Sequence, residues 1–236
     1  MWIAGWQKLS LVDYPDKVAC TLFTGGCNLR CPYCHNSELV TGTFPRVDEK
    51  EITAYLDKRQ NILDGVVISG GEPCMQPDLL PFLRDLKKRQ LLLKLDTNGC
   101  YPDVLGAVLA EHLVDYVAMD LKTSPEDYPM IAGNLPVDFS DIARSLVLLL
   151  TQAASFELRT TVVNELHTEQ NFARIREFLL PLVQTYHRKI PAFYLQAFKD
   201  TETVPFGGFT SPDKIVLEKY AILLEPVAER VSLRGV

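Results

Sequence analysis

The chain has 236 residues, a formal net charge of −6 and a hydrophobic content of 47%. That length suits one α/β domain, so we expect residues 1–236 to form a single domain around a buried core. The acidic balance argues against binding to nucleic acid or to a membrane surface, both of which normally need a basic patch. The sequence shows neither an apolar run of about 20 residues, the length of a membrane helix, nor a signal peptide. We therefore expect a cytoplasmic protein.

Apolar runs rich in β-branched residues alternate along the chain with segments of helical periodicity. The runs predict six strands, at Val18–Phe23, Gly65–Ser69, Leu91–Asp96, Tyr116–Asp120, Phe156–Val163 and Ala192–Gln196. The periodic segments predict helices at about Asp48–Ile62, Gln76–Lys88, Pro102–Glu111, Asp138–Thr151, Thr168–Tyr186 and Ser211–Arg230. Pro102, Pro181 and Pro212 lie where we expect helices to start or end.

Strands that are each followed by a helix predict a parallel sheet, because every crossover returns the chain in the same direction. An open doubly wound sheet and a barrel of six βα units both fit, and the pattern alone does not separate them. In either fold the loops at the carboxyl ends of the strands form the active site. The unusual residues follow strands one to four: a cysteine trio, Ser69–Pro73, Asp96–Gly99 and Asp120–Lys122.

Six cysteines are present, and Cys27, Cys31 and Cys34 lie within eight residues of each other. An even number suits disulfides, but a long chain without an export signal argues against them. Clustered thiolates favour an iron–sulfur cluster or zinc. Three cysteines would leave one iron of a four-iron cluster open to a substrate. A zinc site completed by His35 or by a distant histidine is the alternative. His35 adjoins Cys34, and adjacent residues rarely bind one metal together without strain.

The spacing Cys-x3-Cys-x2-Cys, with the aromatic Tyr33 before the last cysteine, resembles the signature of the radical S-adenosylmethionine (SAM) superfamily. Gly70-Gly71-Glu72-Pro73 resembles the second motif of that superfamily. The resemblance implies a partial (β/α)6 TIM-like barrel with parallel strands. It also implies a [4Fe–4S] cluster on Cys27, Cys31 and Cys34. There SAM would chelate the fourth iron and be cleaved reductively to a 5′-deoxyadenosyl radical. No catalytic side chain beyond the cluster and SAM is expected.

The same resemblance implies roles near SAM for the first two loops. Gly70 and Gly71 would let the backbone approach the SAM ammonium group, whereas a tight turn is the structural alternative. Glu72 would supply negative charge for that ammonium, or it would be an ordinary loop carboxylate. Tyr33 would pack beside the cluster and the adenine, or simply fill its loop.

The later strand ends resemble stretches in the activating enzymes of glycyl-radical proteins. This likeness implies that Asp96 and Lys122 reach SAM and that Asp120 helps bind a monovalent cation. Arg159 and Gln196 are candidates to face the adenosine. Helix caps, ion pairs and buried polar core residues are the structural alternatives for these side chains.

Two further segments of the chain, Gly5–Pro15 and His35–Val40, resemble one subgroup of these activating enzymes. It comprises the activating proteins of anaerobic ribonucleoside-triphosphate reductase, which are similar to pyruvate formate-lyase activating enzymes. Three positions depart from that pattern: Asp16 replaces a usual glycine, Gly25 a larger polar residue and Cys74 a common threonine. If the subgroup holds, the enzyme generates a glycyl radical on the reductase and takes its electron from a flavodoxin- or ferredoxin-type donor.

Two other functions remain open. One is a radical SAM enzyme that acts on a small molecule, like 7-carboxy-7-deazaguanine synthase, and the other is a non-catalytic metal-binding or electron-transfer module. We expect Cys20, Cys74 and Cys100 to be small buried or loop residues. The Gly207-Gly208 loop is a candidate to flex and admit a partner's loop, with a plain surface loop as the alternative.

Overall fold

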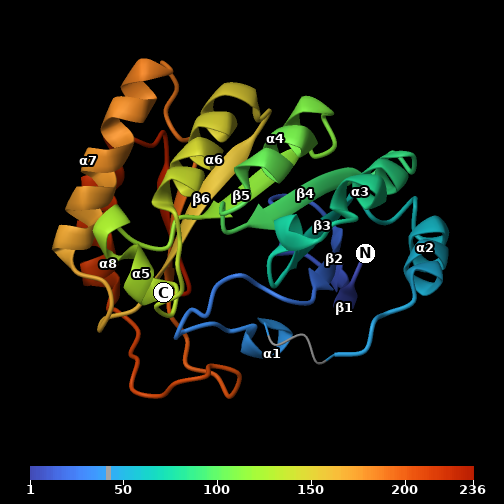
Figure 1. The fold of residues 1–236 in the computed structure, drawn as a ribbon, viewed down its shortest axis with the longest axis horizontal. Coiled ribbons are helices and arrows are strands. Elements are labelled where there is room, and N and C mark those ends of the chain that lie inside the picture. Colours follow the sequence, from blue (N-terminus) through green and yellow to red (C-terminus); the bar gives the residue numbers. More distant parts are fainter. Residues whose placement is uncertain (41–43) are drawn as a thin grey trace.

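A curved sheet of eight strands forms the centre of the molecule, seen in the computed structural model, which describes residues 1–40 and 44–236 (Figure 1). The strands are β1 (Ile3–Ser10), β2 (Ala19–Thr24), β3 (Gly65–Gly70), β4 (Leu92–Thr97), β5 (Tyr116–Asp120), β6 (Phe156–Val162), β7 (Phe193–Ala197) and β8 (Val231–Arg234). Their order in the sheet follows the chain, with β1 and β8 at the edges. A sequential order without reversal identifies a partial barrel and not a doubly wound sheet.

The α-helices are α1 (Ser37–Val40), α2 (Glu49–Lys58), α3 (Leu79–Lys87), α4 (Pro102–Ala110), α5 (Tyr128–Ile131), α6 (Phe139–Gln152), α7 (Glu169–Thr185) and α8 (Lys214–Leu224). Figure 1 shows α3, α4, α6 and α7 side by side on one side of the sheet. Within the residues described, no helix combines the length and apolar character that crossing a membrane would require.

The six predicted strands correspond to β2–β7, and β2–β8 pair in parallel. Two strands were not predicted. β1 pairs antiparallel with β2, and half-buried or exposed residues fill its middle. The predicted helix Ser211–Arg230 ends at Leu224, and the chain then forms β8. Pro181 does not end a helix but lies inside α7, whereas Pro102 occupies the first turn of α4.

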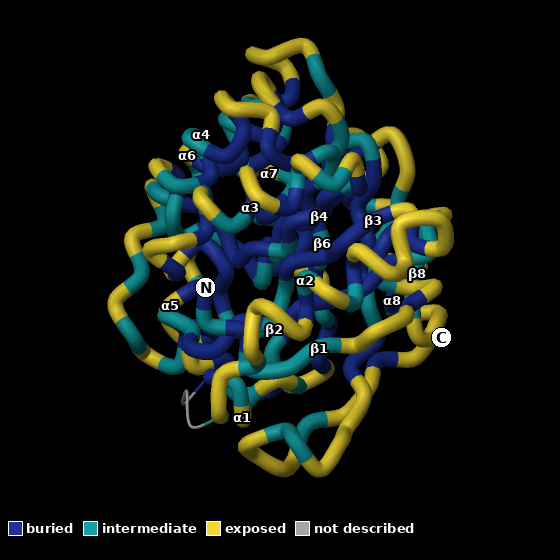
Figure 2. The backbone as a smooth tube through the Cα atoms, turned by 90° about the vertical axis from the view of Figure 1, so that its right-hand side faces the viewer, coloured by how far each residue is buried: buried dark blue, intermediate teal, exposed yellow. Residues whose placement is uncertain are grey.

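The two faces of the sheet bury different kinds of side chain. The outer face, under the helices, carries the main apolar core, in which Leu93 and Leu95 of β4 are fully buried. Because side chains alternate along a strand, Lys94 and Asp96 project to the inner face. Figure 2 shows the buried backbone of the central strands beneath exposed loops. The inner face therefore brings charged groups into the barrel interior, below the loops predicted to form the site.

Candidate active site

A cavity of about 350 Å³ opens at the carboxyl ends of the strands. Its lining includes every residue predicted for the site, namely Cys27, Cys31, Tyr33, Cys34, Gly70, Gly71, Glu72, Asp96, Asp120, Lys122 and Gln196, together with Arg159. These residues come from six different strands or the loops that follow them. Functional loops gather at the carboxyl ends of parallel strands, and this rule predicted that these residues come together.

The three cysteines lie in the loop after β2 and pack against apolar side chains that include Leu29, Tyr33 and Phe198. Cys31 is buried, while Cys27 and Cys34 are half-buried. Burial raises the pKa of the Cys27 thiol to about 12, and it raises the pKa of the other two thiols as well. The positive charge of Lys122 opposes this shift at all three sulfurs. Binding to a metal would remove the protons that burial retains.

Several observations fit the expected cluster and SAM. Among the described residues, no group of three His, Cys, Asp or Glu side chains is placed to hold one metal ion. A four-iron cluster instead binds each thiolate to a different iron. The His35 ring Nε2 lies 2.7 Å from the Lys199 carbonyl oxygen, so Nδ1 is the ring nitrogen that this contact leaves for a metal. The Tyr33 hydroxyl is buried without a partner in the described structure, beside a cavity large enough for a small ligand.

Two backbones approach each other closely at the end of β3, and this approach requires the glycines at positions 70 and 71. Gly70 has a φ of +111°, and a Cβ on it would lie 2.3 Å from the Thr24 nitrogen. A Cβ on Gly71 would lie 1.9 Å from the Gly26 carbonyl oxygen. The Gly71 N–H donates to the Thr24 carbonyl at 2.9 Å. The lack of side chains at Gly70 and Gly71 therefore allows this loop to bond directly to the cysteine loop. This structural role is separate from any contact with SAM.

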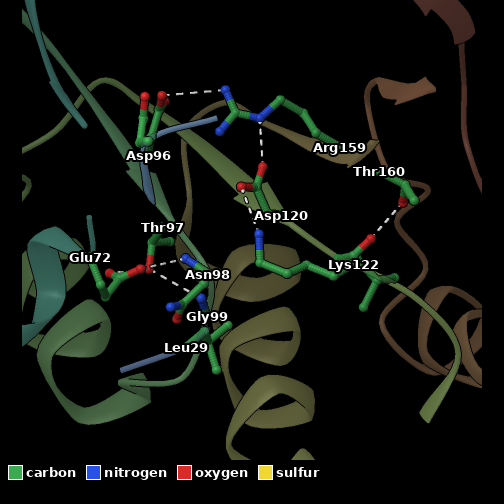
Figure 3. Close-up of polar contacts among 12 residues, drawn as sticks. Leu29, Glu72, Asp96, Thr97, Asn98, Gly99, Asp120, Lys122, Arg159 and Thr160 are labelled. Carbon is green, nitrogen blue, oxygen red and sulfur yellow. Dashed lines mark hydrogen bonds and ion pairs between the residues drawn. The ribbon is translucent and has the colours of Figure 1, made fainter. Parts of the chain in front are cut away.

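Glu72 is almost fully buried and links the loops that follow β3 and β4 (Figure 3). Its Oε1 accepts hydrogen bonds from the Cys74 N–H at 2.9 Å and the Thr97 hydroxyl at 2.8 Å. Its Oε2 accepts one from the Asn98 N–H at 2.7 Å. A carboxylate has about four acceptor positions, and these three bonds together with the nearby Cys74 thiol use most of them within the protein. The residue has a structural role that its position in the motif did not reveal.

We expect Glu72→Ala to lower the free energy of unfolding by roughly 3 kcal/mol, because it leaves three buried donors without an acceptor. Urea denaturation measures the change. Glu165→Ala is the matched control, since Glu165 also accepts from a backbone N–H and a hydroxyl of Thr210 but is exposed. The control is expected to lose less than about 1 kcal/mol. Equal losses in both variants would contradict the structural role of Glu72.

Charged side chains on the inner faces of β4, β5 and β6 form a continuous network (Figure 3). Asp96 accepts from the Ser69 hydroxyl at 2.9 Å and from Arg159 Nη1 at 3.3 Å. Arg159 Nε also donates to Asp120 Oδ1 at 2.9 Å, and Lys122 Nζ lies 3.3 Å from Asp120 Oδ2. Burial alone would raise the pKa of Asp120, but Arg159 and Lys122 lower it to about 2. Both carboxylates are therefore held ionised and in fixed orientations.

Sequence reasoning missed two residues that shape this region. Lys94 is buried on β4, and its ammonium group contacts Asp96 Oδ1. A lysine inside an otherwise apolar strand was the available signal, because a buried lysine needs an anionic partner. Asn98 is buried after β4 and donates a hydrogen bond to Cys27 Sγ at 3.8 Å. Nothing in its sequence neighbourhood indicated that contact.

The segment after β7 lies over the cysteine loop. Besides the His35 contact, the Ser37 hydroxyl contacts the Thr203 carbonyl oxygen. Phe209 packs edge-on against Phe198 with ring centroids 6.3 Å apart, while Phe206 is 61% exposed. Gly207 and Gly208 have open space where side chains would stand. Whether this loop admits a partner stays a prediction.

Comparisons with known proteins agree with this arrangement. The sequence profile of the Radical SAM superfamily matches residues 21–165, more than half of the chain. A Methanocaldococcus jannaschii protein named as a glycyl-radical enzyme activating enzyme is 37% identical over 127 residues, which are 53% of this chain and 52% of that protein. The pyruvate formate-lyase-activating enzyme of Clostridium pasteurianum is 30% identical over 158 residues, or 59% of this chain and 60% of that one. The matched region thus covers about half the length of the first relative and about three-fifths of the second.

Solved structures share the fold. Streptococcus suis SuiB bound to S-adenosylmethionine has a TM-score of 0.67 at 14% identity, covering 89% of this chain and 48% of SuiB. A domain of the pyruvate-formate lyase-activating enzyme from Bacteroides vulgatus has a TM-score of 0.58 at 18% identity. That match covers 72% of this chain and 99% of the domain.

Proposed function

This chain belongs to the radical SAM superfamily, and from that premise we propose that it is the activating enzyme of a glycyl-radical protein. The observation that carries the proposal is the single cavity lined by the three thiols, the Gly70-Gly71-Glu72 loop and the ion network. The curated relatives named as activating enzymes support the same class. We further propose anaerobic ribonucleoside-triphosphate reductase as the partner, because Gly5–Pro15 and His35–Val40 resemble its activating proteins.

The superfamily uses a [4Fe–4S] cluster and SAM. We propose that Cys27, Cys31 and Cys34 hold the cluster, which when bound with SAM supplies electron transfer and a carbon radical for hydrogen abstraction. The apolar side chains around the sulfurs would exclude water and keep the reduction potential low. The buried hydroxyl of Tyr33 would be free to donate to an acceptor in the cavity.

The remaining lining residues are proposed to bind and orient SAM. The backbone at Gly70 and Gly71 and the negative charge of Glu72 suit the ammonium group of SAM. Lys122 suits the carboxylate, and Gln196 lines the cavity from β7, where adenosine would fit. Asp96 would contact SAM from β4. Asp120 remains a proposed ligand of a monovalent cation, which would compete there with Arg159 and Lys122.

The substrate proposed is a backbone glycine of the partner. A glycine α-carbon has no side chain to obstruct approach, which suits an abstraction inside a narrow cavity. We propose a flavodoxin- or ferredoxin-type electron donor and a cytoplasmic location, where reducing conditions keep thiols free. The six cysteines are all unpaired, in keeping with such a compartment.

Electron paramagnetic resonance tests the proposal directly. The protein is reconstituted anaerobically with iron and sulfide, reduced with SAM present, and mixed with anaerobic ribonucleotide reductase. We expect a glycine-centred doublet on the reductase and none with the Cys31→Ala variant. A doublet on pyruvate formate-lyase alone would change the partner but keep the class. No doublet on either protein, together with turnover of a small substrate, would overturn the proposal.

A further inference from the structure

Asn98 lies directly after β4, is only 5% exposed, and has its side chain fixed by hydrogen bonds on every side. Its Oδ1 accepts from the Cys100 N–H at 3.0 Å. Its Nδ2 has two hydrogens and two acceptors in reach, Asn28 Oδ1 at 2.7 Å and Cys27 Sγ at 3.8 Å. Because the oxygen faces a donor and the nitrogen faces two acceptors, the amide has one favourable orientation.

The backbone of Asn98 is fixed as well. Its N–H donates to Glu72 Oε2 at 2.7 Å inside the buried contact between the loops after β3 and β4. The amide therefore cannot turn away from Cys27 without losing bonds at both ends. Cys27 Sγ accepts a second hydrogen bond, from the Leu29 N–H at 3.4 Å. Of these two donors to the sulfur, only the one from Asn98 belongs to a side chain and can be removed by substitution.

We propose that Asn98 sets the reduction potential of the cluster through its N–H···S hydrogen bond to Cys27. This inference rests on the proposed function, in which Cys27 is a cluster ligand. Reduction adds negative charge to the cluster and its sulfur ligands. A donor aimed at a ligating sulfur stabilises the reduced state more than the oxidised state, and so raises the potential. Asn98 is thus a tuning residue that acts through Cys27.

A redox titration followed by electron paramagnetic resonance, without SAM, measures the effect. Asn98→Leu has similar size but no donor, and we expect it to lower the equilibrium constant for cluster reduction about tenfold, or about 59 mV for one electron. Asn98→Asp keeps an acceptor for the Cys100 N–H and replaces the donor by a negative charge, so its potential should fall further. Asn36→Leu is the matched control, because the Asn36 side chain donates to the Gly70 carbonyl oxygen at 3.3 Å. The hydrogen bond of Asn36 to the Cys34 sulfur is made by its backbone and is kept in this variant.

A second readout separates tuning from a structural role. Reductive SAM cleavage by Asn98→Leu should fall when a flavodoxin-type donor supplies electrons and recover with the stronger reductant titanium(III) citrate. Wild-type potentials in both Asn98 variants, each with a full cluster, would overturn the tuning role alone. Loss of the cluster from both variants would also overturn it, in favour of a purely structural role. A wild-type protein that assembles no cluster would instead overturn the proposed function.

Discussion

Replacing Cys27, Cys31 or Cys34 by alanine is expected to abolish reductive SAM cleavage, with a loss of at least about a thousandfold. Three thiolates are the smallest set that holds a four-iron cluster and leaves one iron for SAM, so two thiolates would not retain it. Iron and sulfide content and the yield of 5′-deoxyadenosine measure the effect.

Two other cysteines provide the control for these substitutions. Cys20 is fully buried in the core on β2, and Cys100 packs at the edge of the apolar cluster beside the loop. Cys20→Ala should cost about 1 kcal/mol of stability through lost packing and leave the cluster intact. Cys100→Ala should also retain SAM cleavage, because its contact with Asn98 uses the backbone N–H. Normal 5′-deoxyadenosine production by Cys31→Ala would refute the ligand assignment.

Gly71→Ala is expected to lower SAM cleavage by more than about a hundredfold and stability by about 3 kcal/mol. A Cβ there would lie 1.9 Å from the Gly26 carbonyl oxygen, so the two loops must separate. Separation breaks the bonds from the Gly71 N–H to Thr24 and from the Glu72 N–H to Gly26, both 2.9 Å long. The cysteine loop would then lose its support on the β3 side. The yield of 5′-deoxyadenosine and urea denaturation measure the two effects.

Gly106→Ala is the matched control for that substitution. Gly106 lies within α4, where a Cβ would make an ordinary contact at 3.5 Å with Leu148. Alanine is the better helix former, so the variant should gain up to about 1 kcal/mol and retain SAM cleavage. Unchanged SAM cleavage and stability in Gly71→Ala would show that the backbones are not held as closely as described.

The sequence predicted the inner strands better than the edges of the sheet. β2–β7 are buried and apolar on the side that faces the helices, so their composition is typical of strands and predicts them. β1 carries the polar run Gln7-Lys8, and β8 is four half-buried residues long, so neither shows a strong strand pattern. The last helix was predicted to run to Arg230, directly before β8, whereas α8 ends at Leu224, because its periodicity does not show where the last turn ends.

Residue type and position after a strand predicted which side chains lie together at the carboxyl ends of the strands. The cysteine trio, Asp96, Asp120 and Lys122 all line the cavity. What could not be predicted are contacts between residues far apart in the sequence. Glu72 bonds Asn98 across 26 positions, and Asn98 bonds Cys27 across 71. Such partners depend on the register of neighbouring strands, which no local pattern encodes.

The most direct test of the central claim is to quantify 5′-deoxyadenosine and methionine after the reconstituted protein is reduced anaerobically in the presence of SAM. The account predicts a brown protein with four irons in one cluster, which forms both products in equal amounts. A colourless protein that retains one zinc ion and leaves SAM intact would contradict it.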